Sequence, residues 1–137
     1  MKKLLIFDFD GTLVNTITDV ALCFNRALER YGFEPYPVSD YGRVVGGNLD
    51  VIFSTLLKEE HRTNENIEKL KNAYREIYLN DDKPNTVPFN GITTLLESLK
   101  NKGYYVAINT NKAQPLVDNL CRKIFPHINF DGIVGFV

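Results

Sequence analysis

Apolar runs and amphipathic stretches alternate along the chain, and their spacing predicts its secondary structure. Leu4–Phe7 is a short apolar run that is followed directly by acidic residues, which is typical of a buried parallel strand. The apolar segments 104–109 and 131–137 are predicted as two further strands. Three strands of this kind are expected to form the core of the fold.

Between these runs, apolar residues recur every three or four positions, which is the spacing of one helix face. Gly32 and Gly103 follow two of these stretches and are suitable helix stops. Residues 15–80 contain no convincing strand pattern. The predicted helices span residues 16–31, 51–57, 64–79, 92–102 and 114–124.

The order of strand, helices, strand, helix and strand predicts an α/β fold with a Rossmann-like parallel sheet. The segment 81–88 is rich in turn-forming residues and holds two prolines, so a connection between two units is expected there. The predicted domains are a sheet-containing core, 1–14 with 84–137, and an inserted α-helical domain, 15–83.

Composition narrows the class of function. The chain has 137 residues, 44% of them hydrophobic and 24% charged, with a net charge of −1. These values predict a soluble globular protein without a basic surface for nucleic acid or a membrane. Cys23 and Cys121 fit no metal or redox spacing and are expected to be buried free thiols, which suits a reducing cytoplasm. A function that acts on small molecules is therefore expected.

The most informative motif is Asp8-Phe9-Asp10-Gly11-Thr12-Leu13, directly after the first apolar run. In an extended chain Asp8 and Asp10 project to the same side, about 7 Å apart. Two carboxylates held about 5 Å apart would repel by about 3 kcal/mol at an effective dielectric constant near 20. A bound Mg²⁺ would compensate this repulsion, since hard cations prefer oxygen ligands. The alternative is that acidic residues follow the strand only because the chain enters solvent there.

The residues around the carboxylates suit a phosphate. Gly11 allows a sharp turn, and Thr12 offers a hydroxyl and an amide donor beside the cation. Thr110 and Asn111 are predicted to lie in a polar turn after the second strand, and they would share a crevice with Asp8 and Asp10 if the two strands are neighbours.

Lys112 follows the same predicted turn. It would supply positive charge to a phosphate, or it is a solvated lysine that begins a helix.

These motifs resemble those of the haloacid dehalogenase-like hydrolases, and within them the phosphoglycolate phosphatase-like group. The hexapeptide that begins at Asp8 matches the first motif of this family, and Ile108–Lys112 resembles the second. The helical segment between them matches the position and size of the family's α-helical cap domain. The resemblance extends over essentially the whole chain.

The resemblance implies a Mg²⁺-dependent phosphatase that acts on a small-molecule phosphomonoester. Asp8 would attack phosphorus and form an aspartyl-phosphate, and Asp10 would act as general acid and then as general base. Mg²⁺ would bind Asp8 and the carbonyl of Asp10. Arg43 would contact the substrate from the cap, although a solvated loop arginine is an equally good interpretation. The phosphate would be held by Thr110, with Asn111 and Lys112 beside it, and by backbone amides of Phe9, Gly11 and Thr12.

The family's third motif, a lysine, and its fourth, an acidic pair, would lie downstream of Val137. We therefore expect the core to be incomplete at its C-terminal side. Two alternatives to the phosphatase stay open from the sequence. One is a phosphomutase of the same fold, and the other is a truncated, non-catalytic fragment that binds a phosphorylated ligand or a partner.

Overall fold

The computed structural model describes residues 3–137, which divide into two compact units. One unit comprises the chain up to Thr16 together with Thr86–Val137, and we call it the sheet unit. The other, Ile17–Asn85, is called the helical unit. Each unit has its own buried hydrophobic cluster, so each is described by itself below.

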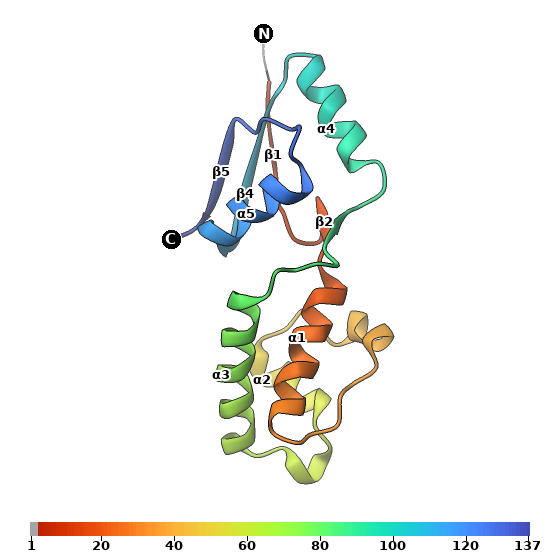
Figure 1. Cartoon of the computed structure of the whole chain (residues 1–137), viewed down its shortest axis with the longest axis vertical. Coiled ribbons are helices and arrows are strands. Elements are labelled where there is room, and N and C mark those ends of the chain that lie inside the picture. The colour runs from red at the N-terminus through yellow and green to blue at the C-terminus, as the bar shows by residue number, and fades with distance from the viewer. Residues whose placement is uncertain (1–2) are drawn as a thin grey trace. The chain divides into compact units, whose positions relative to one another are not determined.

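The sheet unit is built on three parallel strands, β1 (Leu4–Phe7), β4 (Tyr105–Ala113) and β5 (Gly132–Phe136), in the order β1-β4-β5 (Figure 1). Helices α4 (Ile92–Asn101) and α5 (Gln114–Ile124) belong to the same unit. The predicted α/β class with a parallel sheet is therefore confirmed.

The core of the sheet unit lies between the strands and these two helices. Val106 and Ile108 of β4 are almost fully buried and pack with Leu96 of α4 and with Val117 and Leu120 of α5. Because strand side chains alternate between faces, both β4 residues project from the same side of the sheet. Burial of such aliphatic side chains supplies the main stabilising free energy of this unit.

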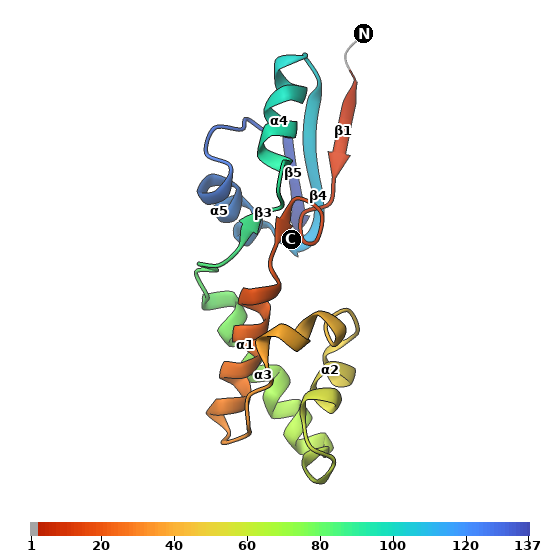
Figure 2. The ribbon, with the colours of Figure 1, turned by 90° about the vertical axis from the view of Figure 1, so that its right-hand side faces the viewer.

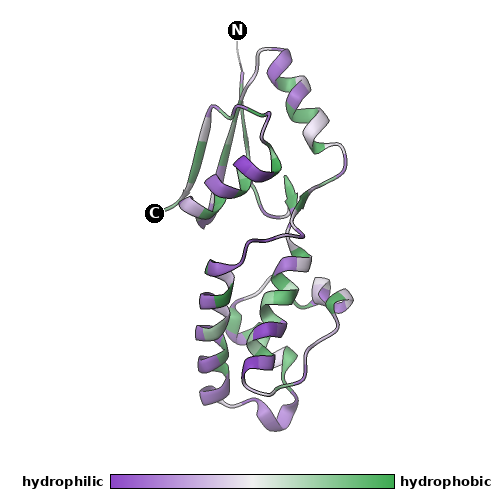
Figure 3. Ribbon diagram, in the orientation of Figure 1, coloured by the Kyte–Doolittle hydropathy of each residue, from purple (hydrophilic) through white to green (hydrophobic). Residues whose placement is uncertain are grey.

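The helical unit contains α1 (Ile17–Arg30), α2 (Leu49–Leu56) and α3 (Asn64–Asn80), with two short 3-10 helices, Val38–Arg43 and Glu59–His61. Figure 3 shows hydrophilic and hydrophobic residues alternating along α1 and α3, as expected for helices that bury one face. No helix within residues 3–137 is long and apolar enough to cross a bilayer.

Side chains fix where two of these helices begin. The Asn48 side chain accepts a hydrogen bond from the Val51 amide at 3.0 Å, and Thr63 accepts one from the Asn66 amide at 3.2 Å. Both contacts satisfy amides that have no partner inside the first turn of a helix. The starts of α2 and α3 are thus determined locally by sequence.

Two details differ from the predicted elements. A pair of two-residue strands, β2 (Val14–Asn15) and β3 (Val87–Pro88), forms a small antiparallel sheet that the sequence pattern did not predict. The residues 110–112, predicted as a polar turn, belong to β4 instead. The pairing of β4 with β5 is irregular between Asn109 and Ala113, the stretch that holds these polar residues.

Candidate active site

Asp8 and Asp10 follow the last residue of β1 that pairs with β4. β1 pairs with β4 in parallel, and Phe7 is opposite Ile108. Asp8 therefore follows directly after β1, beside the stretch of β4 that carries Thr110 and Lys112. The expectation that these two strands are neighbours is confirmed, and this edge of a parallel sheet is where α/β proteins bind ligands.

Two side chains of the loop after β1, Phe9 and Leu13, are fully inaccessible to solvent and pack in the hydrophobic cluster of the sheet unit. Their burial holds the polar residues between them at the surface. Gly11 has φ of 77°, a conformation that side chains with a Cβ rarely adopt, so glycine is suited to this turn. The apolar residues of the motif thus position its polar ones.

The amides of this loop have partners within the loop itself. The Phe9 amide donates to Asp8 Oδ1 at 2.8 Å, and the Gly11 amide donates to the Val14 carbonyl at 3.0 Å. The Thr12 amide lies 3.3 Å from the Phe9 carbonyl that it donates to. A phosphate bound by these amides would have to share or replace these hydrogen bonds, so phosphate contacts by Phe9, Gly11 and Thr12 stay a prediction.

Asp10 forms an ion pair with Lys112, whose Nζ lies 3.4 Å from Asp10 Oδ1. The Lys112 side chain is only 2% exposed, whereas that of Asp10 is 37% exposed. A nearby cation favours the ionised form of a carboxylate, and screening by water is weak on the buried side of this pair. The sequence left Lys112 open as a solvated lysine, and the structure excludes that interpretation because its side chain is buried.

Thr110 is also nearly buried and sits two residues before Lys112 on β4. Its Oγ1 accepts a hydrogen bond from the Lys112 amide at 3.1 Å. A hydroxyl oxygen that accepts in this way still has its own proton to donate. Thr110 is therefore able to donate a hydrogen bond to an anion, while Asn111, between the two, is exposed.

Arg43 belongs to the helical unit, at the end of the 3-10 helix Val38–Arg43. Its side chain is 85% exposed and pairs with Asp40 at 3.1 Å, three residues earlier. An exposed ion pair of this kind contributes little to stability. Contact between Arg43 and a substrate stays a prediction.

A divalent cation would find oxygen donors here in the Asp8 carboxylate and in the backbone carbonyl of Asp10. Among residues 3–137, the structure forms no group of three or more His, Cys, Asp or Glu side chains that could hold a metal. Mg²⁺ does not need such a cage, because it keeps several waters and typically takes one or two carboxylates together with substrate phosphates. The oxygen-only donors of Asp8 and Asp10 therefore fit Mg²⁺ better than a softer metal such as zinc.

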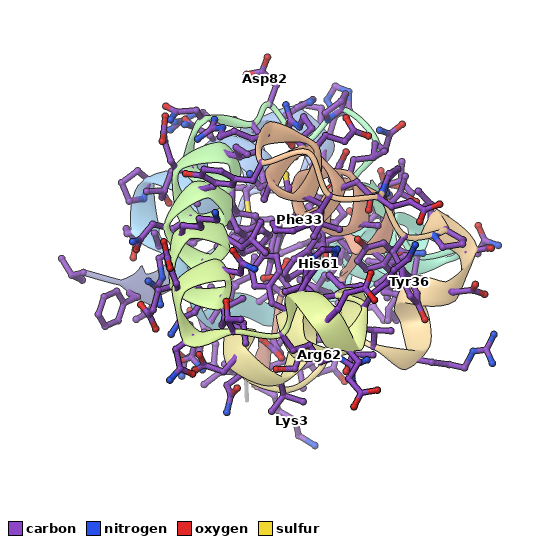
Figure 4. All side chains as sticks on the ribbon, turned by 90° about the horizontal axis from the view of Figure 1, so that it is seen from below. Lys3, Phe33, Tyr36, His61, Arg62 and Asp82 are labelled. Carbon is purple, nitrogen blue, oxygen red and sulfur yellow. The ribbon has the colours of Figure 1, made fainter. Side chains whose placement is uncertain are left out.

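One cavity was not predicted from the sequence. It has a volume of about 610 Å³ and lies within the helical unit, lined by the aromatic residues Phe33, Tyr36 and His61 and by Arg62, among others (Figure 4). Its residues come from the segment after α1, from the end of α2 and from the segment after α2, which carry no recognisable motif. The acidic pair of the sheet unit does not contribute to it.

Comparison with known proteins identifies the family. The sequence profile of the haloacid dehalogenase-like hydrolases matches residues 5–136. The phosphoglycolate phosphatases of Aquifex aeolicus and Psychrobacter arcticus are 31% and 29% identical, over 97% and 98% of this chain. The chain spans 60% and 61% of the length of these two relatives.

Solved structures agree with the sequence comparison. A hydrolase of the haloacid dehalogenase-like family from Streptococcus pneumoniae is 25% identical and superposes with a TM-score of 0.77. The superposition covers 99% of this chain and 62% of that structure. The match of the profile to nearly the whole sequence, together with the parallel sheet, leads to one conclusion: this chain belongs to the haloacid dehalogenase-like hydrolase family.

Proposed function

We propose that the protein acts as a Mg²⁺-dependent phosphatase on small phosphorylated metabolites, of the phosphoglycolate or sugar phosphate kind, through an aspartyl-phosphate on Asp8. The observation that carries this proposal is the Asp10–Lys112 ion pair next to Asp8, at the edge shared by β1 and β4. The relatives named phosphoglycolate phosphatase support the same reaction class. The buried free thiols of Cys23 and Cys121 suit a reducing, cytoplasmic location.

Asp8 is the proposed nucleophile because its carboxylate is exposed at the strand end. Its hydrogen bond from the Phe9 amide fixes the orientation of one carboxylate oxygen. An oxygen of Asp8 forms the bond to phosphorus while the bond between phosphorus and the leaving alcohol breaks. Water then attacks the same phosphorus and releases Asp8 unchanged, together with inorganic phosphate.

Asp10 is the proposed proton carrier. It gives a proton to the leaving alcohol in the first step and takes one from water in the second, help that is typically worth about 10² to 10⁴ in rate. The Lys112 ammonium lies 3.4 Å from the Asp10 carboxylate in the free protein and would also attract an arriving phosphate.

The remaining charge on the phosphate is balanced by a cation and by hydrogen bonds. The Asp8 carboxylate and the backbone carbonyl of Asp10 would hold Mg²⁺, which would neutralise charge that develops on the phosphoryl oxygens. The Thr110 hydroxyl donates a hydrogen bond to one of those oxygens. We assign the helical unit the role of a cap, with Arg43 as its basic contact to the substrate, and a closed cap would exclude water from the site.

The test is hydrolysis of p-nitrophenyl phosphate by the 137-residue protein with Mg²⁺. We expect release of p-nitrophenol that falls by at least about 10³-fold in Asp8→Asn, because the nucleophile is lost. Glu97→Gln, an exposed change on α4, is the matched control and should keep full activity. Equal background release by all three proteins would contradict the proposed phosphatase.

A further inference from the structure

The cavity of the helical unit has the size of a binding site for a small molecule. It lies between the segment that follows α1, residues 32–37, and residues 55–62, which include the end of α2 and the 3-10 helix Glu59–His61. Figure 2 shows the three helices that these segments connect. The volume of about 610 Å³ is within the range of about 300–1,000 Å³ that is typical of small-molecule sites. The cavity is therefore large enough for an aromatic compound of one or two rings.

Aromatic side chains form part of the cavity wall. Phe33 and His61 come from the two different segments, and their ring centroids lie 5.3 Å apart. Tyr36 contributes a third ring. All three residues are half-buried, so each keeps accessible surface for a ligand. Such rings bind another aromatic ring through stacked and edge-to-face contacts.

Hydrogen bonds hold this wall in place without a ligand. The Tyr36 amide donates to Asn25 Oδ1, and Asn25 Nδ2 donates to the Tyr36 carbonyl, each at 2.9 Å. Asn25 is buried, and its Oδ1 also accepts from the Tyr41 hydroxyl at 2.6 Å. Pro35 and Pro37 flank Tyr36 and restrict the backbone further. Because these contacts fix Tyr36 in advance, binding would lose little entropy in ordering this wall.

The charged side chains that line the cavity leave a net positive charge. Lys58 pairs with Glu34 at 3.2 Å, so these two charges compensate each other. Arg62 has no carboxylate partner among residues 3–137. Its Nε donates to the Leu57 carbonyl at 2.9 Å, which orients the guanidinium group and leaves the donors of its terminal nitrogens for other groups. A guanidinium group held in this way suits two parallel hydrogen bonds to a carboxylate.

We propose that this cavity binds a small aromatic carboxylate, with its ring against the three aromatic side chains and its anionic group on Arg62. An apolar ligand would leave the guanidinium charge without a counter-charge, and an inorganic anion would leave the aromatic wall unused. No residue of the motif that begins at Asp8 lines the cavity, so the proposal does not depend on phosphatase activity.

The test is a titration of the 137-residue protein with naphthoate, followed through the backbone amide signals in two-dimensional NMR spectra. Naphthamide, which has nearly the same shape and no charge, is the matched probe. Arg62→Gln removes the guanidinium group. Arg75→Gln, an exposed change on α3 that removes the same charge away from the cavity, is the control variant.

We expect naphthoate to saturate one site and to shift the amide signals of residues 32–37 and 55–62. Naphthamide should bind at least about tenfold more weakly, because it lacks the charge that pairs with Arg62. Arg62→Gln should lose affinity for naphthoate by a similar factor, whereas Arg75→Gln should bind it as the parent protein does.

The proposal is overturned if naphthoate gives no saturable shifts, or if the shifts centre on other residues. Equal affinity of the parent protein for naphthoate and naphthamide would also overturn it, as would an Arg62→Gln variant that binds naphthoate like the parent. The comparison of the two probes uses the parent protein alone, so it stays decisive even where Arg62→Gln folds poorly.

Discussion

At the scale of single residues, the burial of Lys112 is the feature that most changes the description of the site. A lysine that follows an apolar strand is usually solvated, and no sequence pattern distinguishes the buried case. The D-x-D-G-T motif, in contrast, marks Asp8 and Asp10 directly through its spacing. The sequence therefore predicts the acidic pair as site residues, whereas the partner of Asp10 depends on how β4 is placed beside the loop after β1.

Lys112→Met tests this ion pair. We expect it to lower the free energy of unfolding by about 1–3 kcal/mol, because Asp10 Oδ1 is inaccessible to solvent and loses its cationic neighbour. The double variant Lys112→Met/Asp10→Asn should recover part of that loss, since no charge is then left without a partner. Urea unfolding at pH 7 measures both values. A double variant no more stable than Lys112→Met would contradict the role of the ion pair.

Gly135 tests a second close contact in the sheet unit. A Cβ at this position would lie 2.7 Å from the Lys112 carbonyl oxygen and 2.9 Å from Gln114 Cα. Because both are backbone atoms, β5 or the start of α5 must move, and Gly135→Ala is expected to destabilise the protein by about 1–3 kcal/mol.

Gly132→Ala is the matched control for Gly135→Ala, since its nearest neighbour would be Ala107 Cβ at 3.8 Å, an ordinary contact. Urea unfolding curves of the two variants should therefore have clearly different midpoints. Equal midpoints would mean that the backbone near Gly135 adjusts without cost.

At the scale of elements, periodicity predicted the regular structure well where it extends over several residues. The strand Leu4–Phe7 has the predicted bounds, and the ends of α1 to α5 lie within about two residues of their predicted positions. The strands β2 and β3 are too short for an alternating pattern. The polar composition of residues 110–112 resembles that of a turn, although these residues lie within β4, between its paired residues Asn109 and Ala113.

Inside the helical unit, α1 is connected to the segment after α3 through Asp19. This buried side chain accepts hydrogen bonds from the Asn85 amide at 3.0 and 3.1 Å and from Asn85 Nδ2 at 3.1 Å. We expect Asp19→Ala to cost about 1–3 kcal/mol, because the Asn85 donors lose their acceptor. Proteolysis within residues 81–86 should also become faster, since that segment is held less firmly.

Glu76→Ala is the control for Asp19→Ala. Glu76 also accepts from a partner across the unit, Arg30 at 3.2 Å, but both side chains are well exposed. Exposed pairs of this kind are typically worth less than about 1 kcal/mol. Thermal unfolding and limited proteolysis should therefore leave Glu76→Ala close to the parent protein, and a similar loss in both variants would contradict the role of Asp19.

At the scale of the whole molecule, the two units have separate buried clusters. The cluster of the helical unit includes Phe24, Tyr41, Phe53 and Leu70, all from residues 17–85. We expect a polypeptide of residues 17–85 to fold alone, with a helical circular dichroism spectrum and a cooperative thermal transition. A spectrum of a disordered chain would show that this cluster is insufficient for independent folding.

The proposed function requires that Asp8 accepts a phosphoryl group beside Mg²⁺. Beryllofluoride mimics that group, and a ligand that binds only the folded state raises the melting temperature. The most direct measurement is therefore thermal unfolding with Mg²⁺ and beryllofluoride. We expect a rise in Tm for the parent protein and for Glu97→Gln, and none for Asp8→Asn. No rise in the parent, or an equal rise in Asp8→Asn, would contradict it.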